Sequence, residues 1–264
     1  MNPFKRPLSA VIFLAATMVL PLPAQEKEKE KGKEKPVEIS LRLIAFTPDL
    51  QIAEAYAHDP AADGSTASVM TPVKTYLNHE FLKVKTASGR FVFTTKADRE
   101  SITREGELIG EVTLPEKATS ALLVFFPVKA GETPKCKIVA FDDSKKAFPQ
   151  GTYLAANICD LPARLTLEKT DFDFEPNEIR LLGKPPLREG GVAGMHAFVK
   201  QDDAWKQIST GLWSDPGSGR SIKIFFQSPD SGKFQIRAFD DVPPRETAEA
   251  AKTSKSKKKK KGNN

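Results

Sequence analysis

The chain has 264 residues, and 39% of them are hydrophobic, which is enough for a folded core. Its formal net charge is +6, and the last twenty residues, 245–264, account for all of it with eight basic and two acidic side chains. Because residues 36–244 carry a net charge of −3, the composition argues against a nucleic-acid-binding domain, which would cluster its basic residues on the fold.

Residues 1–24 predict a secretory signal peptide. Lys5 and Arg6 precede an apolar run at 8–20, and Ala24 is small enough to be the last residue before cleavage. The alternative is a single membrane anchor, but the run is shorter than the roughly 20 residues that span a bilayer. We therefore expect an exported protein, periplasmic or extracellular.

Both ends of the mature chain are low in complexity. Residues 25–36 consist mainly of alternating Lys and Glu, and they predict a disordered, charged tether. Residues 245–264 predict a disordered tail that ends in five lysines, Lys257, Lys258, Lys259, Lys260 and Lys261. Such a tail would give weak contact with anionic lipid or lipopolysaccharide, although a tail that only raises solubility is the alternative.

Between the two ends, the pattern is that of an all-β protein. Short runs of β-branched and aromatic residues alternate with Gly, Pro, Asp and Asn, which is typical of sandwiches and barrels. Within this body, only residues 49–59 have a composition that suits a helix. The expected strands cover 37–46, 68–77, 81–87, 90–96, 107–114, 120–128, 136–142, 152–159, 163–169, 178–183, 195–201, 204–213, 220–227 and 233–239.

One sequence pattern occurs twice. "LLVFFPVKAGETPKCKIVAFDDS" is echoed by "SIKIFFQSPDSGKFQIRAFDDV", and six of nine positions are identical between 135–143 and 233–241. A chance match of two strands is the alternative, but the echo favours a duplicated β-hairpin unit. We therefore expect two β-sandwich-like modules, antiparallel and immunoglobulin-like or related, at 37–185 and 186–244.

The echoed segments end in paired acids, Asp142–Asp143 and Asp240–Asp241, which suggest either a metal or acid–base site or a structural turn. Adjacent strand residues point to opposite faces, so the sequence favours aspartates that cap turns. A second acidic cluster, at 171–175, predicts an amphipathic strand with its acids in water. Because the three histidines are scattered and no nucleophile or phosphate-loop motif is present, we expect no catalytic residue, metal ligand or cofactor.

The two cysteines, Cys136 and Cys159, lie at the outer ends of two strands that are neighbours in sequence. If those strands pair antiparallel, the thiols fall opposite each other. An oxidising compartment would then favour a structural disulfide between them. Two buried free thiols are the alternative.

Three aromatic residues, Tyr153, Trp205 and Trp213, are candidates for a platform on which a sugar ring could stack. The two tryptophans are eight residues apart, and they share one face if their strand is continuous. The alternative is that these side chains cover the hydrophobic core.

The run from "LLVFFP" through "KIVAFDDSKKAFPQGTYLAANICDLPARLTLEKTDFDFEPNEIRLL" to "WKQISTGLWSDPGSGRSIKIFF" resembles a group of uncharacterised exported bacterial β-sandwich-like proteins. The resemblance covers about 120–240 and implies a fold but no activity. We therefore expect a non-enzymatic β protein with a structural or interaction role at the cell envelope. A glycan-binding module is the alternative, a hydrolase ranks last, and the identity of a protein or glycan partner is open.

Overall fold

The computed structural model of the chain describes residues 36–242, except 51, 53, 63–67, 78 and 184. The predicted signal peptide at 1–24, nearly all of the tether at 25–36 and the lysine tail at 245–264 lie outside the described residues.

The described part of the chain is built from strands, with two short 3₁₀ helices and no α-helix, which confirms the predicted all-β class. None of its helices is long or apolar enough to span a membrane. The elements are β1 Val37–Ala45, β2 Glu54–His58, β3 Val69–Pro72, β4 Leu82–Thr86, β5 Arg90–Thr94, η1 Arg99–Thr103, η2 Glu105–Glu107, β6 Leu108–Thr113, β7 Ser120–Pro127, β8 Cys136–Asp142, β9 Tyr153–Asn157, β10 Ala163–Leu167, β11 Thr170–Phe174, β12 Ile179–Leu182, β13 Val192–Gln201, β14 Ala204–Ser214, β15 Arg220–Gln227 and β16 Phe234–Asp241.

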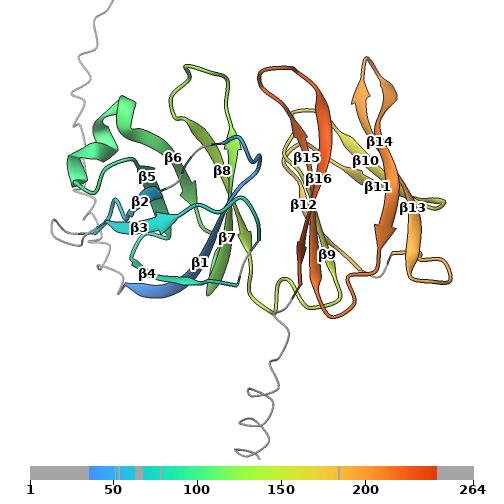
Figure 1. Cartoon of the computed structure of the whole chain (residues 1–264), viewed down its shortest axis with the longest axis horizontal. Helices are drawn as coiled ribbons and strands as arrows, with labels where there is room; N and C mark the ends of the chain where they lie inside the picture. The colour runs from blue at the N-terminus through green and yellow to red at the C-terminus, as the bar shows by residue number, and fades with distance from the viewer. Residues whose placement is uncertain are drawn as a thin grey trace, which may run out of the picture. The chain divides into compact units, whose positions relative to one another are not determined.

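The strands form four sheets, which pair into two sandwiches (Figure 1). In the N-terminal sandwich, sheet A (β4-β1-β7-β8) faces sheet B (β3-β2-β5-β6). In the C-terminal sandwich, sheet C (β12-β9-β15-β16) faces sheet D (β11-β10-β13-β14). The two sandwiches have the same strand order. Adding eight to each strand number of sheets A and B gives the order in sheets C and D. Pairing is antiparallel except where β1 lies beside β7 and β9 beside β15.

The boundary between the two sandwiches differs from the one expected at 185/186. Strand β9 pairs with β15 and β10 pairs with β13, while β12 and β11 pair with β9 and β10. Residues 153–182 therefore belong to the C-terminal sandwich. The sheets therefore divide between β8 and β9, across residues 143–152. The expected boundary falls in the Pro- and Gly-rich stretch 183–191, which connects β12 and β13 within one sandwich.

Three hydrophobic cores hold the four sheets together. The first lies between sheets A and B, and the third lies between sheets C and D. The second lies between sheets A and C, where Phe46 and Phe126 meet Phe226 and Phe239. Because both faces of sheets A and C are covered, their strands are apolar on both faces, as in "LLVFF" and "IKIFF".

Candidate functional site: a buried charge cluster between the sandwiches

A charged residue interrupts the apolar sequence of β1. Leu41 and Leu43 face the first core, and Arg42 faces the opposite way, toward sheet C, on the same face as Ile44. The whole Arg42 residue is only 1% exposed. A guanidinium buried this deeply requires carboxylate partners, since an unpaired buried charge is strongly unfavourable.

The echoed aspartates, one from each sandwich, both bind Arg42. Arg42 Nε and Nη2 donate to Asp143 Oδ2 and Oδ1 at 2.8 and 2.7 Å. Its Nη1 and Nη2 donate to Asp241 Oδ1 and Oδ2 at 3.1 and 3.0 Å. Asp143 directly follows β8, and Asp241 is the last residue of β16. A single side chain thus bridges the two sandwiches through two bidentate, charge-assisted contacts.

A second arginine balances the charge. Arg220, the first residue of β15, donates from Nε to Asp241 Oδ2 at 3.0 Å, and its Nη2 lies 3.0 Å from Asp143 Oδ1. Its Nη1 donates to the carbonyl of Phe148 at 3.1 Å, and the Phe148 ring lies 4.6 Å from the guanidinium. The cluster therefore contains two positive and two negative groups.

The burial of the cluster sets its electrostatics. Burial alone would raise the pKa of Asp241, but the hydrogen bonds and charges of Arg42 and Arg220 outweigh it, and the net pKa is lowered. Burial would likewise lower the pKa of Arg42, but the two carboxylates reverse the effect and the net pKa is raised. Both shifts favour the charged forms of Asp241 and Arg42.

Two partly exposed side chains, those of His79 and Phe81, flank the buried cluster. The imidazole of His79 donates from Nε2 to the carbonyl of Val242 at 2.5 Å and lies 3.6 Å from Asp241 Oδ1. The half-exposed ring of Phe81 lies 5.1 Å from the Arg42 guanidinium, beside a cavity of about 140 Å³. Arginine cannot exchange protons near neutral pH, and both carboxylates are engaged by guanidinium groups. The arrangement is suited to fastening the sandwiches together.

The turn-capping prediction for the four paired aspartates is right for Asp142 and wrong for the other three. Asp240 lies within β16 and not at a turn. Asp142 Oδ1 accepts the backbone N–H of Ser144 at 2.9 Å, as a turn cap does. Asp143 and Asp241 instead point into the buried cluster. Sequence analysis missed both arginines, Arg42 and Arg220. Arg42 had a signal in the sequence, since it is a lone charge within the apolar run "LRLIAF".

The other acidic cluster behaves as expected. Asp171 and Asp173 of β11 are exposed, and Phe174 is buried in the third core. The Arg164 side chain donates to Asp173 Oδ1 and Oδ2 at 2.5 and 2.8 Å. Within the described residues, no three His, Cys, Asp or Glu side chains gather in a way that could hold a metal ion.

The predicted aromatic platform does not form. Trp213 and Tyr153 are each 1% exposed, and their rings pack at a tilt in the third core, with centroids 4.8 Å apart. Trp205 lies on the other face of sheet D, half-buried, with the Arg164 guanidinium 4.3 Å from its ring. The reason is a bulge in β14 at Ile208, which inserts one residue between the two tryptophans. The side chains of Trp205 and Trp213 therefore point to opposite faces of sheet D.

The predicted disulfide between Cys136 and Cys159 is wrong. Both thiols are free and buried, Cys136 in the first core and Cys159 in the third. The disulfide required strands β8 and β9 to pair, but they belong to different sheets, A and C. The thiols therefore lie in separate cores.

Free, buried thiols should resist alkylation in the native protein. Burial raises the pKa of both thiols to about 12, from an ordinary 9.0. We expect roughly a thousandfold less thiolate at pH 8 than an exposed thiol would have. Iodoacetamide should therefore modify neither cysteine in the native state and both in urea without reductant, as measured by intact mass. A requirement for reductant before labelling in urea would contradict the free-thiol state.

The fold and the charge cluster define a two-sandwich, all-β protein whose halves share a buried ionic contact. In comparisons with known proteins, no family model matches the chain, and no curated protein matches it.

Proposed function

We propose that the chain is an exported, non-enzymatic β protein with a structural or interaction role at the cell envelope. The observation that carries the proposal is the separation of charge along the sequence: the tail at 245–264 holds +6, while residues 36–244 hold −3. The buried charge cluster supports it further, because its arginines and aspartates are engaged with one another. We therefore assign contact with an anionic surface to the positively charged tail.

The proposed target of the tail is anionic lipid or lipopolysaccharide. A lysine near such a surface contributes about 1 kcal/mol, and the attraction weakens with salt. The resemblance to exported bacterial β proteins supports the same location. This resemblance rests on sequence motifs, and it does not point to any enzymatic activity.

Vesicle binding tests the role of the tail. We expect the full chain to bind phosphatidylserine vesicles at low salt, and a variant with Lys257 to Lys261 changed to glutamine to bind roughly a hundredfold or more weakly. A matched control changes five exposed lysines of the sandwiches to glutamine and should bind like the unchanged chain. The control positions are Lys83, Lys85, Lys117, Lys129 and Lys206. Equal binding by the tail variant and the control would overturn the proposal.

A glycan-binding role through exposed aromatics is the second candidate, and one observation favours it. Trp205 lies partly exposed on the outer face of sheet D, with Arg164 fixed beside it by Asp173. Of the three aromatic residues first considered, it alone is partly exposed. A glycan array in which Trp205→Ala binds no differently from the unchanged chain would remove this candidate, and a hydrolase ranks behind both.

We also infer that the two sandwiches arose by duplication of one eight-stranded unit. The shared strand order supports this, and so does the position of the echo, whose two copies form β7–β8 and β15–β16. In such a unit Asp143 and Asp241 occupy equivalent positions. Arg42 has no charged counterpart, because the equivalent residue beside β15 is Leu154.

A further inference from the structure

The N-terminal sandwich has an open side where two edge strands lie near each other. Strand β8 ends the order of sheet A, and β6 ends the order of sheet B. An edge strand leaves alternate backbone N–H and C=O groups without a neighbour in its sheet. The hydrogen-bond register identifies which residues carry these groups.

In β8 the register follows from one bond. The N–H of Asp143 donates to the carbonyl of Ser120 at 3.0 Å, so Asp143 and Ser120 form a hydrogen-bonded pair. Hydrogen-bonded pairs recur every two residues along an antiparallel ladder. Phe141 and Val139 therefore bond to β7, whereas Ile138 and Ala140 direct their backbone groups outward.

In β6 the register again follows from one bond. The N–H of Leu114 donates to the carbonyl of Gly89 at 2.8 Å, which makes Val112 a residue bonded to β5. Glu111 and Thr113 therefore direct their backbone N–H and C=O groups away from β5, toward the open side.

The two edges meet at one end and are separated at the other. Near the start of β6, the N–H of Lys135 reaches the carbonyl of Leu108 over a long 3.5 Å. A side chain at Gly110 would place its Cβ 2.7 Å from the carbonyl oxygen of Cys136, so only glycine allows this approach. Beyond it, a pocket of about 380 Å³ opens between 111–113 and 138–140.

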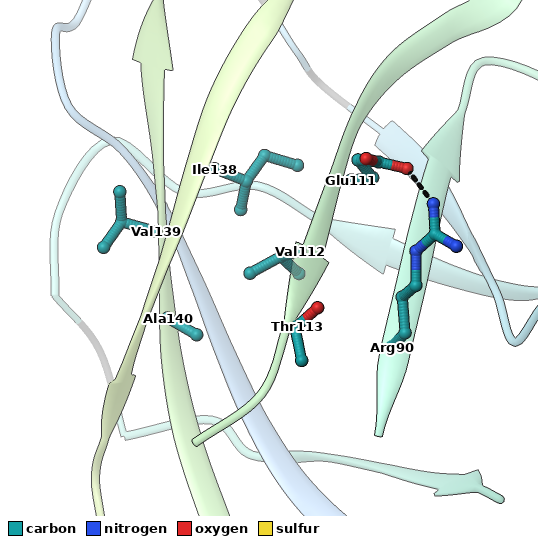
Figure 2. Close-up of a pocket in the computed structure, with 7 residues that line it drawn as sticks. All are labelled: Arg90, Glu111, Val112, Thr113, Ile138, Val139 and Ala140. Atoms are coloured by element: carbon teal, nitrogen blue, oxygen red, sulfur yellow. Dashed lines mark hydrogen bonds and ion pairs between the residues drawn. The ribbon is translucent and has the colours of Figure 1, made fainter. Parts of the chain in front are cut away.

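The lining of the pocket fits an extended backbone. Figure 2 shows the side chains of Val112 and Ile138 between the ribbons of β6 and β8. At the rim, Arg90 and Glu111 form an ion pair with each other, so the pocket has no excess charge there. The pocket thus offers outward main-chain donors and acceptors above a small apolar floor.

We propose that this pocket binds an extended segment of another polypeptide, which adds as a strand between β8 and β6. The segment exchanges main-chain hydrogen bonds with Ile138 and Ala140 on one side and with Glu111 and Thr113 on the other. It presents a small apolar side chain to Val112 and Ile138, and it carries no net charge. This inference goes beyond the proposed function, because it depends on neither the tail nor the cell envelope.

The test uses a fluorescein-labelled peptide of alternating threonine and valine, and the same peptide N-methylated at alternate backbone nitrogens. The full chain should bind the first peptide saturably, as followed by fluorescence anisotropy, and should bind the N-methylated one at least about tenfold more weakly. On binding, the amides of Ile138 and Ala140 should gain protection from hydrogen exchange. Equal binding of both peptides, or the absence of saturable binding, overturns the proposal.

A matched pair of proline variants locates the site. Ala140→Pro removes an outward N–H without removing a bond to β7, which edge positions tolerate. Ala238 is its counterpart in β16. The Ser228 N–H donates to the carbonyl of Lys233, and this register directs the backbone N–H of Ala238 away from β15. Ala140→Pro should weaken binding at least about tenfold, and Ala238→Pro should change it less than about twofold. The reverse order overturns the proposal. If Ala140→Pro does not fold, the N-methylated peptide still decides the question on the unchanged chain.

Discussion

Replacing Arg42 with methionine should lower the free energy of unfolding by about 3–5 kcal/mol, as expected when one partner of a buried ionic cluster is removed. The change keeps most of the side-chain volume but leaves Asp143 and Asp241 facing each other with Arg220 as their remaining guanidinium partner within the cluster. The side chains of both carboxylates are nearly inaccessible to water, at 1% and 2% exposure. Solvent therefore cannot compensate for the lost guanidinium. Urea denaturation gives the value.

The matched control is Arg90→Met. Arg90 also sits on a strand and pairs with a carboxylate, Glu111, but the two side chains are 47% and 55% exposed. Exposed pairs contribute about 0–1 kcal/mol, so this variant should lose no more than that. If Arg42→Met loses as little as Arg90→Met, the cluster does not hold the sandwiches together.

Replacing Phe46 with alanine should cost about 3–5 kcal/mol, the usual range for a fully buried phenylalanine. Its ring is inaccessible to solvent and packs 4.8 Å from Phe126 and 4.7 Å from Phe226, measured between ring centroids. Phe126 belongs to sheet A and Phe226 to sheet C, so the cavity would open in the core that the two sandwiches share. The loss should therefore destabilise both sandwiches at once.

Two optical signals separate the sandwiches in this experiment. The chain has two tryptophans, Trp205 and Trp213, and both lie in the C-terminal sandwich, so tryptophan fluorescence reports on that half. Far-ultraviolet circular dichroism reports on all the strands. In Phe46→Ala both transitions should shift together. The exposed Tyr76 provides a control, and Tyr76→Ala should shift neither by more than about 0.5 kcal/mol. A fluorescence transition unmoved by Phe46→Ala would contradict a shared core.

Most strands follow from the sequence, because their alternation and turn residues are local. The main exception is β2, which lies within residues 49–59, where the composition suited a helix. Its buried Ala55 and Ala57 pack in the first core, and its pairing with β3 and β5 overrides their helical preference. The bulge at Ile208 could not be predicted either, because a strand with one extra residue looks continuous in sequence.

The boundary between sandwiches and the charge cluster depend on long-range pairing. Arg42 lies 101 residues from Asp143 and 199 residues from Asp241, and no local pattern connects them. The echo located the two carboxylates at equivalent strand ends but did not reveal what they bind. A prediction from sequence would have needed the stacking of sheet A on sheet C, which brings both strand ends to the same face of β1.

Arg42 of one sandwich and Asp241 of the other should be energetically coupled. A double-mutant cycle with Arg42→Met and Asp241→Asn, measured by urea denaturation, gives the coupling energy, and the exposed Asp240→Asn replaces Asp241→Asn in a parallel control cycle. We expect a coupling energy above about 1.5 kcal/mol for Arg42 with Asp241, as measured for other close, desolvated charge pairs. The control should stay within about 0.5 kcal/mol of zero. A coupling energy near zero in both cycles would show that the echoed aspartates do not join the two sandwiches through Arg42.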